Sequence, residues 1–257
     1  MSNEYNLFEQ EDSLITNPTA RVPICLCLDT SGSMNAVESG ETVATDKTVN
    51  VDGRDWYIVD GGVTRLMELQ EGIEQFYHEI REDEVARYSA EICVVDFNNT
   101  AHCIMEYGNV DNEKDIPKLK ANGITAMGEG VNLALDLLDK RKHEYQEKGV
   151  DYFQPWLILM TDGEPNGDQA ELDRAIERVN NLVNDRKMTI FPIGIGKEAD
   201  LELLKKFSPN RQPLRLKGMK FKEFFAWLSQ SVSRTSQSMP GESVKLDMDG
   251  VLGWGEL

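Results

Sequence analysis

The feature that most constrains the fold is an alternation of short apolar runs with longer helical patterns. Near-continuous apolar runs are typical of strands buried on both faces. Apolar residues spaced three and four apart are typical of amphipathic helices. The apolar runs cover residues 22–28, 92–97, 156–160 and 189–195, and the helical patterns cover 66–80, 131–138, 172–183 and 221–228. Because strands that alternate with helices favour a parallel sheet, we predict an α/β fold with a doubly wound, mostly parallel sheet and helices on both faces.

Two further segments are rich in β-forming residues. Residues 101–107 follow the run at 92–97 after a short Asn98-Asn99 turn, which predicts an antiparallel strand at one edge of the sheet. Residues 38–62 contain two β-rich pieces around Asp52-Gly53, a typical hairpin turn, so we predict an inserted β-hairpin. A structural role and a partner-facing role are equally compatible with this insert.

The same patterns set the domain boundaries. We expect a lead-in over residues 1–20, a single domain over 21–232 that contains the 38–62 hairpin, and a polar C-terminal tail over 233–257. The tail is expected to fold back onto its own domain.

The charge balance excludes some partners. The chain has 45 acidic and 27 basic residues and a formal charge of −18, so it repels phosphate backbones and anionic lipid surfaces. We therefore expect no nucleic-acid partner and no membrane partner. The polar start of the chain lacks the features of a secretory signal, and no apolar run reaches the roughly 18 residues of a membrane helix. We expect a cytoplasmic protein whose cysteines (Cys25, Cys27, Cys93 and Cys103) are buried free thiols and not metal ligands.

Hydroxyls and carboxylates follow the ends of the predicted strands. Asp29-Thr30-Ser31-Gly32-Ser33 follows the first strand, Thr161-Asp162-Gly163 follows the strand at 156–160, and Asn122–Thr125 precedes the helix at 131. Ligands of open α/β sheets bind at this carboxyl edge. Oxygen donors without imidazole or thiolate select Mg²⁺, Mn²⁺ or Ca²⁺ over zinc or copper. The candidate metal ligands are Asp29, Ser31, Ser33, Thr125 and Asp162.

These three motifs resemble the metal-ion-dependent adhesion site of von Willebrand factor A domains. The match is D-x-S-x-S at 29–33, a threonine at 125 and T-D-G at 161–163, and it extends over about residues 21–232. The chain also resembles the small bacterial cytoplasmic A-domain proteins of the tellurite-resistance (TerY-like) group. That resemblance implies a Rossmann-like fold and a role in stress response or in tellurite or metal resistance.

The family resemblance also implies a role for each candidate residue. Ser31 and Ser33 would bind the metal directly, Thr125 directly or through water, and Asp29 and Asp162 mostly through water. An acidic side chain of a partner protein would fill the open position. The resemblance therefore implies a non-enzymatic, divalent-cation-dependent protein-binding module. Two departures from the family pattern are the roughly 28 residues between the first site loop and the first helix, and Ile124 before Thr125.

Other interpretations of the same residues remain open. Residues 29–33 alone are compatible with a turn that bonds its own backbone. Residues 162–173 nearly match a calcium loop, which leaves a second cation site at Glu164 or Asp168 as an alternative. A metal-assisted phosphate-ester hydrolase is less favoured because no general base, lysine or arginine accompanies the motifs. The last alternative is a metal-free scaffold that binds through the hairpin or the tail.

Overall fold

The protein is built on a central, mostly parallel sheet. The structure, a computed structural model, describes Leu14 and residues 16–51, 54–110, 116–208, 211–216, 220–241 and 255–256. In this part of the chain the sheet has the strand order β5-β4-β1-β6-β7-β8-β9. The strands are β1 (Val22–Asp29), β4 (Ala90–Phe97), β5 (Ala101–Asn109), β6 (Trp156–Thr161), β7 (Thr189–Ile195), β8 (Leu214–Leu216) and β9 (Gly255–Glu256). Antiparallel β5 forms one edge, as predicted, and the short β9 adds a second antiparallel strand at the other.

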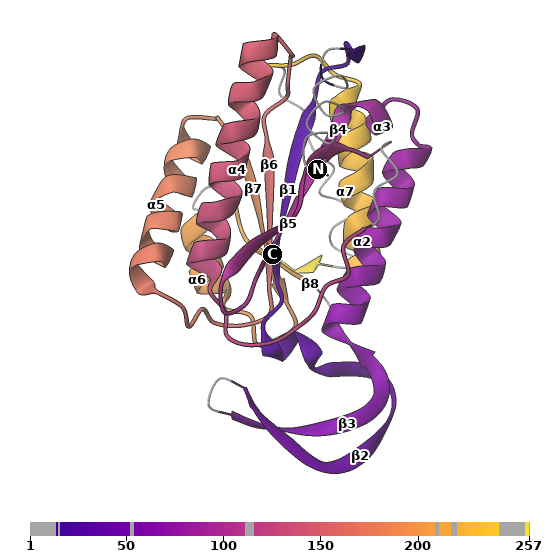
Figure 1. The fold of residues 1–257 in the computed structure, drawn as a ribbon, viewed down its shortest axis with the longest axis vertical. Coiled ribbons are helices and arrows are strands. Elements are labelled where there is room, and N and C mark those ends of the chain that lie inside the picture. Colours follow the sequence, from indigo (N-terminus) through magenta and orange to yellow (C-terminus); the bar gives the residue numbers. More distant parts are fainter. Residues whose placement is uncertain are drawn as a thin grey trace, which may run out of the picture.

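Helices cover both faces of this sheet (Figure 1). On one face α2 (Arg65–Glu82) packs against α7 (Phe221–Ser236), with the short α3 (Ala86–Ser89) beside them. On the other face α4 (Met127–Lys148), α5 (Gln169–Asn184) and α6 (Leu201–Phe207) lie side by side. Strand β1 is buried on both sides because Leu26 and its even-numbered neighbours join one core cluster, and Cys25 and Cys27 join the other. The predicted doubly wound α/β fold is therefore confirmed.

The insert is a long hairpin outside the central sheet. Strands β2 (Val37–Val51) and β3 (Arg54–Thr64) pair only with each other, as a separate two-stranded sheet. Figure 1 shows the hairpin curving below the end of the body where the short 3₁₀ helix η1 (Gly32–Asn35) follows β1. The predicted Asp52-Gly53 turn lies outside the described residues.

The last helix is longer than the sequence pattern predicts. Helix α7 continues to Ser236, three residues beyond the expected start of the tail at 233. The serine and threonine hydroxyls that made this stretch look unstructured bond instead to helix carbonyls one turn back, as Thr235 does to Ser231. Within the tail, Gly255 and Glu256 pair with β8, and residues 242–254 lie outside the described part of the chain. No helix in the described residues combines the length and apolar character that crossing a membrane requires.

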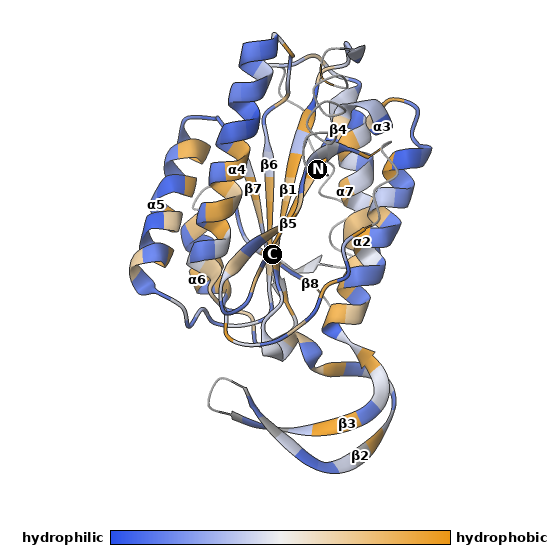
Figure 2. Cartoon of the chain, in the orientation of Figure 1, coloured by the Kyte–Doolittle hydropathy of each residue, from blue (hydrophilic) through white to orange (hydrophobic). Residues whose placement is uncertain are grey.

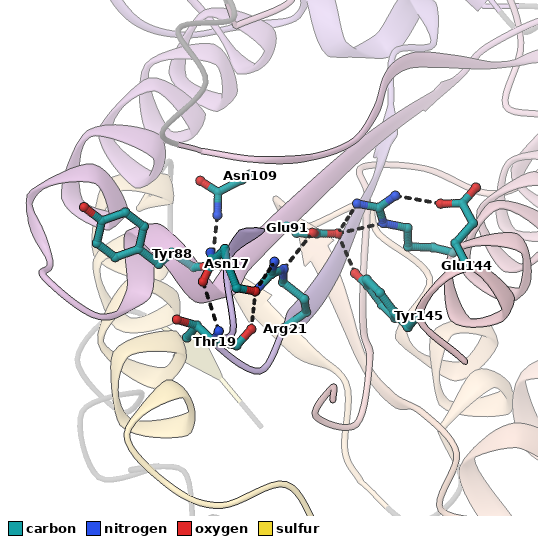
Figure 3. Close-up of polar contacts among 9 residues, drawn as sticks. Asn17, Thr19, Arg21, Tyr88, Glu91, Asn109, Glu144 and Tyr145 are labelled. Atoms are coloured by element: carbon teal, nitrogen blue, oxygen red, sulfur yellow. Dashed lines mark hydrogen bonds and ion pairs between the residues drawn. The ribbon is translucent and has the colours of Figure 1, made fainter. Parts of the chain in front are cut away.

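A buried charge network lies at the amino ends of the strands, opposite the candidate ligands (Figure 3). Glu91, the second residue of β4, accepts hydrogen bonds from Arg21 (3.1 Å) and from Arg141 and Tyr145 of α4 (2.7 and 2.5 Å). Glu91 and Arg21 are each only 1% exposed. The network therefore ties the start of β1 and of β4 to the second half of α4.

Close packing of α4 on α5 depends on a glycine. A Cβ atom at Gly128 would lie 2.4 Å from the backbone nitrogen of Leu172, a distance that real Cβ atoms do not reach. Gly128→Ala is therefore expected to lower the free energy of unfolding by about 1–3 kcal/mol, the usual cost of overpacking. Denaturant unfolding checks this, with Glu129→Ala on the same helix turn as the control. Equal midpoints for the two variants would contradict the close contact.

Candidate metal centre

Three loops meet at the carboxyl edge of the sheet. Asp29 is the last residue of β1, Asp162 follows β6 directly, and the loop 121–126 leads into α4. Backbone hydrogen bonds join these loops. Gly32 donates to Gly123 (3.0 Å) and Asn122 to the carbonyl of Thr30 (2.9 Å), while Asn166 donates to the carbonyl of Thr125 (3.3 Å). The loops therefore form one connected platform.

Hydroxyls link the two carboxylates across this platform. The Ser31 amide donates to Oδ1 of Asp29 (2.8 Å), and the hydroxyls of Ser31 and Ser33 lie 3.0 Å apart. The Ser33 hydroxyl donates to Oδ1 of Asp162 (2.7 Å). The Thr161 hydroxyl donates to the other oxygen of Asp29 (2.6 Å). Four of the five predicted ligands, Asp29, Ser31, Ser33 and Asp162, thus form a continuous chain of contacts.

The fifth predicted ligand, Thr125, lies in the neighbouring loop. Thr125 is almost fully buried, and its amide donates to the side-chain oxygen of Asn166 (2.6 Å). The carbonyl of Thr125 accepts a hydrogen bond from the Asn166 amide, so Thr125 lies against the loop that follows Asp162. No hydroxyl contact of Thr125 with the other four is among the described hydrogen bonds.

Burial disfavours the ionised form of both carboxylates. Burial, together with the nearby Asp162 carboxylate, raises the pKa of Asp29 to about 7, despite the bonds from Ser31 and Thr161. Burial also raises the pKa of Asp162, and the bonds from Ser33 and Arg65 offset part of that rise. Two carboxylates that resist ionisation side by side form an environment that a cation would stabilise.

Sequence patterns missed Arg65, which the fold brings to this site. Its guanidinium donates to Oδ2 of Asp162 (2.9 Å) and also bonds Glu38 at the base of the hairpin (2.6 Å). Glu198 lies 3.7 Å from the same guanidinium nitrogen that bonds Asp162. The expectation that no arginine accompanies the site is therefore wrong. Both ends of this guanidinium are occupied by carboxylates of the protein itself.

Side chains of the calcium-like loop at 162–173 have other roles in the structure. The Asp168 carboxylate caps α5 by accepting from the Ala170 amide (2.7 Å), and Asn166 bonds Thr125. Glu164 and Asp168 are exposed, whereas Asp162 is buried. In the described residues, no group of three or more His, Cys, Asp and Glu side chains is placed to bind a metal.

A hard cation nevertheless fits the donor set of the candidate centre. Two carboxylates and three hydroxyl residues offer oxygen alone, which suits Mg²⁺ with several retained waters. The raised pKa of Asp29 supports this fit, because a cation would replace the proton that burial favours. Ser31 and Ser33 lie between the carboxylates, where a bound ion would contact their hydroxyls.

The whole arrangement matches a known domain family. The model of the von Willebrand factor type A domain matches residues 24–224, most of the chain. The chain belongs to this family. A curated relative, an uncharacterized protein of Synechocystis sp., is 27% identical over 198 residues. The match covers 75% of this chain and 37% of that protein, so this A-domain chain spans about a third of its relative.

Solved structures show the same fold at low sequence identity. A von Willebrand factor type A structure from Catenulispora acidiphila has a TM-score of 0.57 at 19% identity, covering 84% of this chain and 43% of that one. The PilB minor pilin of Streptococcus sanguinis has a TM-score of 0.53 at 14% identity, with 84% and 62% covered. The pilus adhesin SpaC of Lactobacillus rhamnosus GG has a TM-score of 0.58 at 13% identity, with 84% and 31% covered.

Arg65 is expected to weaken cation binding at this A-domain site. A guanidinium beside Asp162 repels a divalent ion, and even in bulk water two unit charges 4 Å apart interact by about 1 kcal/mol. Arg65→Gln should therefore tighten Mg²⁺ binding by about fivefold or more in calorimetric titrations. Arg174→Gln, at an exposed arginine on α5, removes the same charge and should leave the affinity unchanged. Weaker binding by Arg65→Gln would mean that Arg65 chiefly holds Asp162 in place.

Proposed function

We propose that this A domain is a divalent-cation-dependent protein-binding module. Mg²⁺, with Mn²⁺ or Ca²⁺ as alternatives, would be held by Ser31 and Ser33 and anchored by Asp29, Asp162 and Thr125. A domains generally mediate protein interactions, and the observation that carries the proposal is the pair of buried carboxylates bridged by two serine hydroxyls.

The chemistry of the partner follows from the charge of the site. A cation that is only partly neutralised attracts a further anionic oxygen, so the partner would present an aspartate or glutamate side chain. The acidic protein, with its formal charge of −18, has no need of a basic patch for this recognition. We further propose a cytoplasmic protein of a bacterial stress-response or tellurite- or metal-resistance system, which rests on the family resemblance alone.

The proposal includes that the protein is not an enzyme. The rival is a metal-assisted phosphate-ester hydrolase, which needs a cationic group free to bind the substrate phosphate. Arg65, the cationic side chain bonded to the site, already contacts Glu38 and Asp162. Turnover of a generic phosphate ester with Mg²⁺ that Asp29→Ala abolishes would favour the hydrolase instead.

The module is tested by capture of a partner. The full chain is immobilised and incubated with bacterial lysate in Mg²⁺, and retained proteins are identified by mass spectrometry. Retention should be lost on adding EDTA and in Ser31→Ala, and kept in Ser238→Ala, whose hydroxyl bonds a helix carbonyl far from the site. A partner retained equally with EDTA and by Ser31→Ala would show that recognition does not use the metal.

A further inference from the structure

The β2–β3 hairpin and the site loops enclose a groove of about 1010 Å³. One wall is the inner face of the hairpin, including Thr42, Tyr57 and Val59, and the other is the loop 121–124. Gly32, between the two serines of the candidate centre, lines the same groove. The groove therefore begins beside the loop that carries the two serines.

The hairpin is unusual because nothing in the described chain covers it. A two-stranded sheet is marginally stable by itself in water, and its outer edges offer unpaired backbone groups. Tyr57 is 80% exposed, Ile58 39%, and Ile124 across the groove 37%. Figure 2 shows the hydrophobic stretch on β3. Exposed apolar groups thus line the groove, where a partner would bury them.

The charges of the groove define what fits. Its one charged lining residue is Glu38, which Arg65 neutralises, so the described interior is uncharged. The exposed charges of the hairpin are mostly acidic, with Glu41, Asp46, Asp55 and Asp60 against Lys47. This surplus disfavours a second copy of the chain, which carries a charge of −18, and favours a segment that also carries basic residues.

We propose that the groove binds an extended segment of a partner protein with three parts. An acidic side chain reaches the cation, apolar side chains pack against Tyr57 and Ile124, and basic residues face the acidic side chains of the hairpin. Tyr57 lies seven residues along β3 from Thr64, so a partner residue on Tyr57 lies roughly seven extended residues from the base of the hairpin. The acidic part of this inference rests on the proposed function, and the apolar contact does not.

To test this, the full chain is used in Mg²⁺ as the bait to select binding peptides from a phage-displayed library of random peptides. Enriched peptides are synthesised and their affinities measured by fluorescence anisotropy. We expect peptides that combine an acidic residue, apolar residues and basic residues. Tyr57→Ser and Ile124→Ser should each weaken binding about tenfold, as loss of an aromatic or aliphatic anchor does. Val43→Ser is the control, because Val43 is 70% exposed on the same hairpin and does not line the groove.

The outcomes separate this inference from the proposed function. EDTA and Ser31→Ala could abolish binding while Tyr57→Ser and Ile124→Ser leave it intact. That result would contradict the proposed groove contact and support the metal-dependent module. If binding needs Tyr57 and Ile124 but persists in EDTA, the apolar contact is supported and the metal-dependent recognition is contradicted. A library that yields no peptide dependent on Tyr57 overturns the inference. So does a dimer, detected by sedimentation, that Tyr57→Ser converts to a monomer.

Discussion

Asp29→Asn is expected to weaken Mg²⁺ binding by about a hundredfold while stabilising the metal-free protein. Asparagine can keep both local bonds of Asp29, accepting from the Ser31 amide and donating to the Thr161 hydroxyl. It removes only the charge, and residues that orient metal ligands typically contribute about 10–100-fold to affinity. Calorimetric titration of chelator-treated protein measures the affinity.

The stabilisation should depend on pH. The pKa of Asp29 is about 7 in the folded chain and about 3.9 when unfolded, so between these values the folded state binds more protons. Its contribution is therefore fully present below about pH 4 and lost as the pH rises through 7, by up to about 4 kcal/mol. The neutral variant lacks this loss, so its advantage in unfolding free energy without metal should grow from pH 4 to pH 7.

A matched variant separates the candidate centre from the calcium-loop alternative. Asp168→Asn removes the same charge from the following loop and preserves the helix cap, because asparagine caps as well as aspartate. It should leave both the Mg²⁺ affinity and the pH profile unchanged. Loss of affinity in Asp168→Asn with retention in Asp29→Asn would move the cation to the calcium-like loop.

Glu91→Gln is expected to lower the free energy of unfolding by about 3–5 kcal/mol. The change leaves Arg21 and Arg141 without their shared carboxylate in a site that is 1–5% exposed, and an unpaired buried charge is costly. Urea unfolding followed by circular dichroism measures the loss. The control is Glu144→Gln, which removes the partly exposed carboxylate that also bonds Arg141 and should cost about 1 kcal/mol or less.

The site and the network are at opposite ends of the strands, so their tests are independent. Glu91→Gln should leave Mg²⁺ affinity unchanged under conditions where the variant is folded. Equal stabilities of Glu91→Gln and Glu144→Gln would show that the buried network contributes little to the fold.

Periodicity in the sequence was sufficient to predict the core of this fold. Strands β1, β4, β6 and β7 are long apolar runs, and burial on both faces is what produces such runs. Helix α4 extends ten residues past its predicted end at 138, because its second half faces solvent over much of its surface and loses the apolar pattern. Short elements such as β8, with three residues, carry too little pattern to predict.

The contacts that could not be predicted from the sequence join residues far apart in the chain. Arg65 and Asp162 are 97 positions apart, and Glu91 and Arg141 are 50 apart. One signal did exist for Arg65, because a basic residue at the start of a helix opposes the helix dipole and calls for a compensating carboxylate. The five candidate ligands were found because each follows a strand or precedes a helix at the same sheet edge.

The central claim is that a divalent cation binds between the two serines. Crystals of the full chain grown with Mn²⁺, measured at a wavelength where manganese scatters anomalously, locate the ion directly. We expect one strong anomalous peak at coordination distance from the Ser31 and Ser33 hydroxyls, with Asp29 and Asp162 beside it. A peak at Glu164 and Asp168 instead, or no peak while the guanidinium of Arg65 stays bonded to Asp162, would contradict the claim.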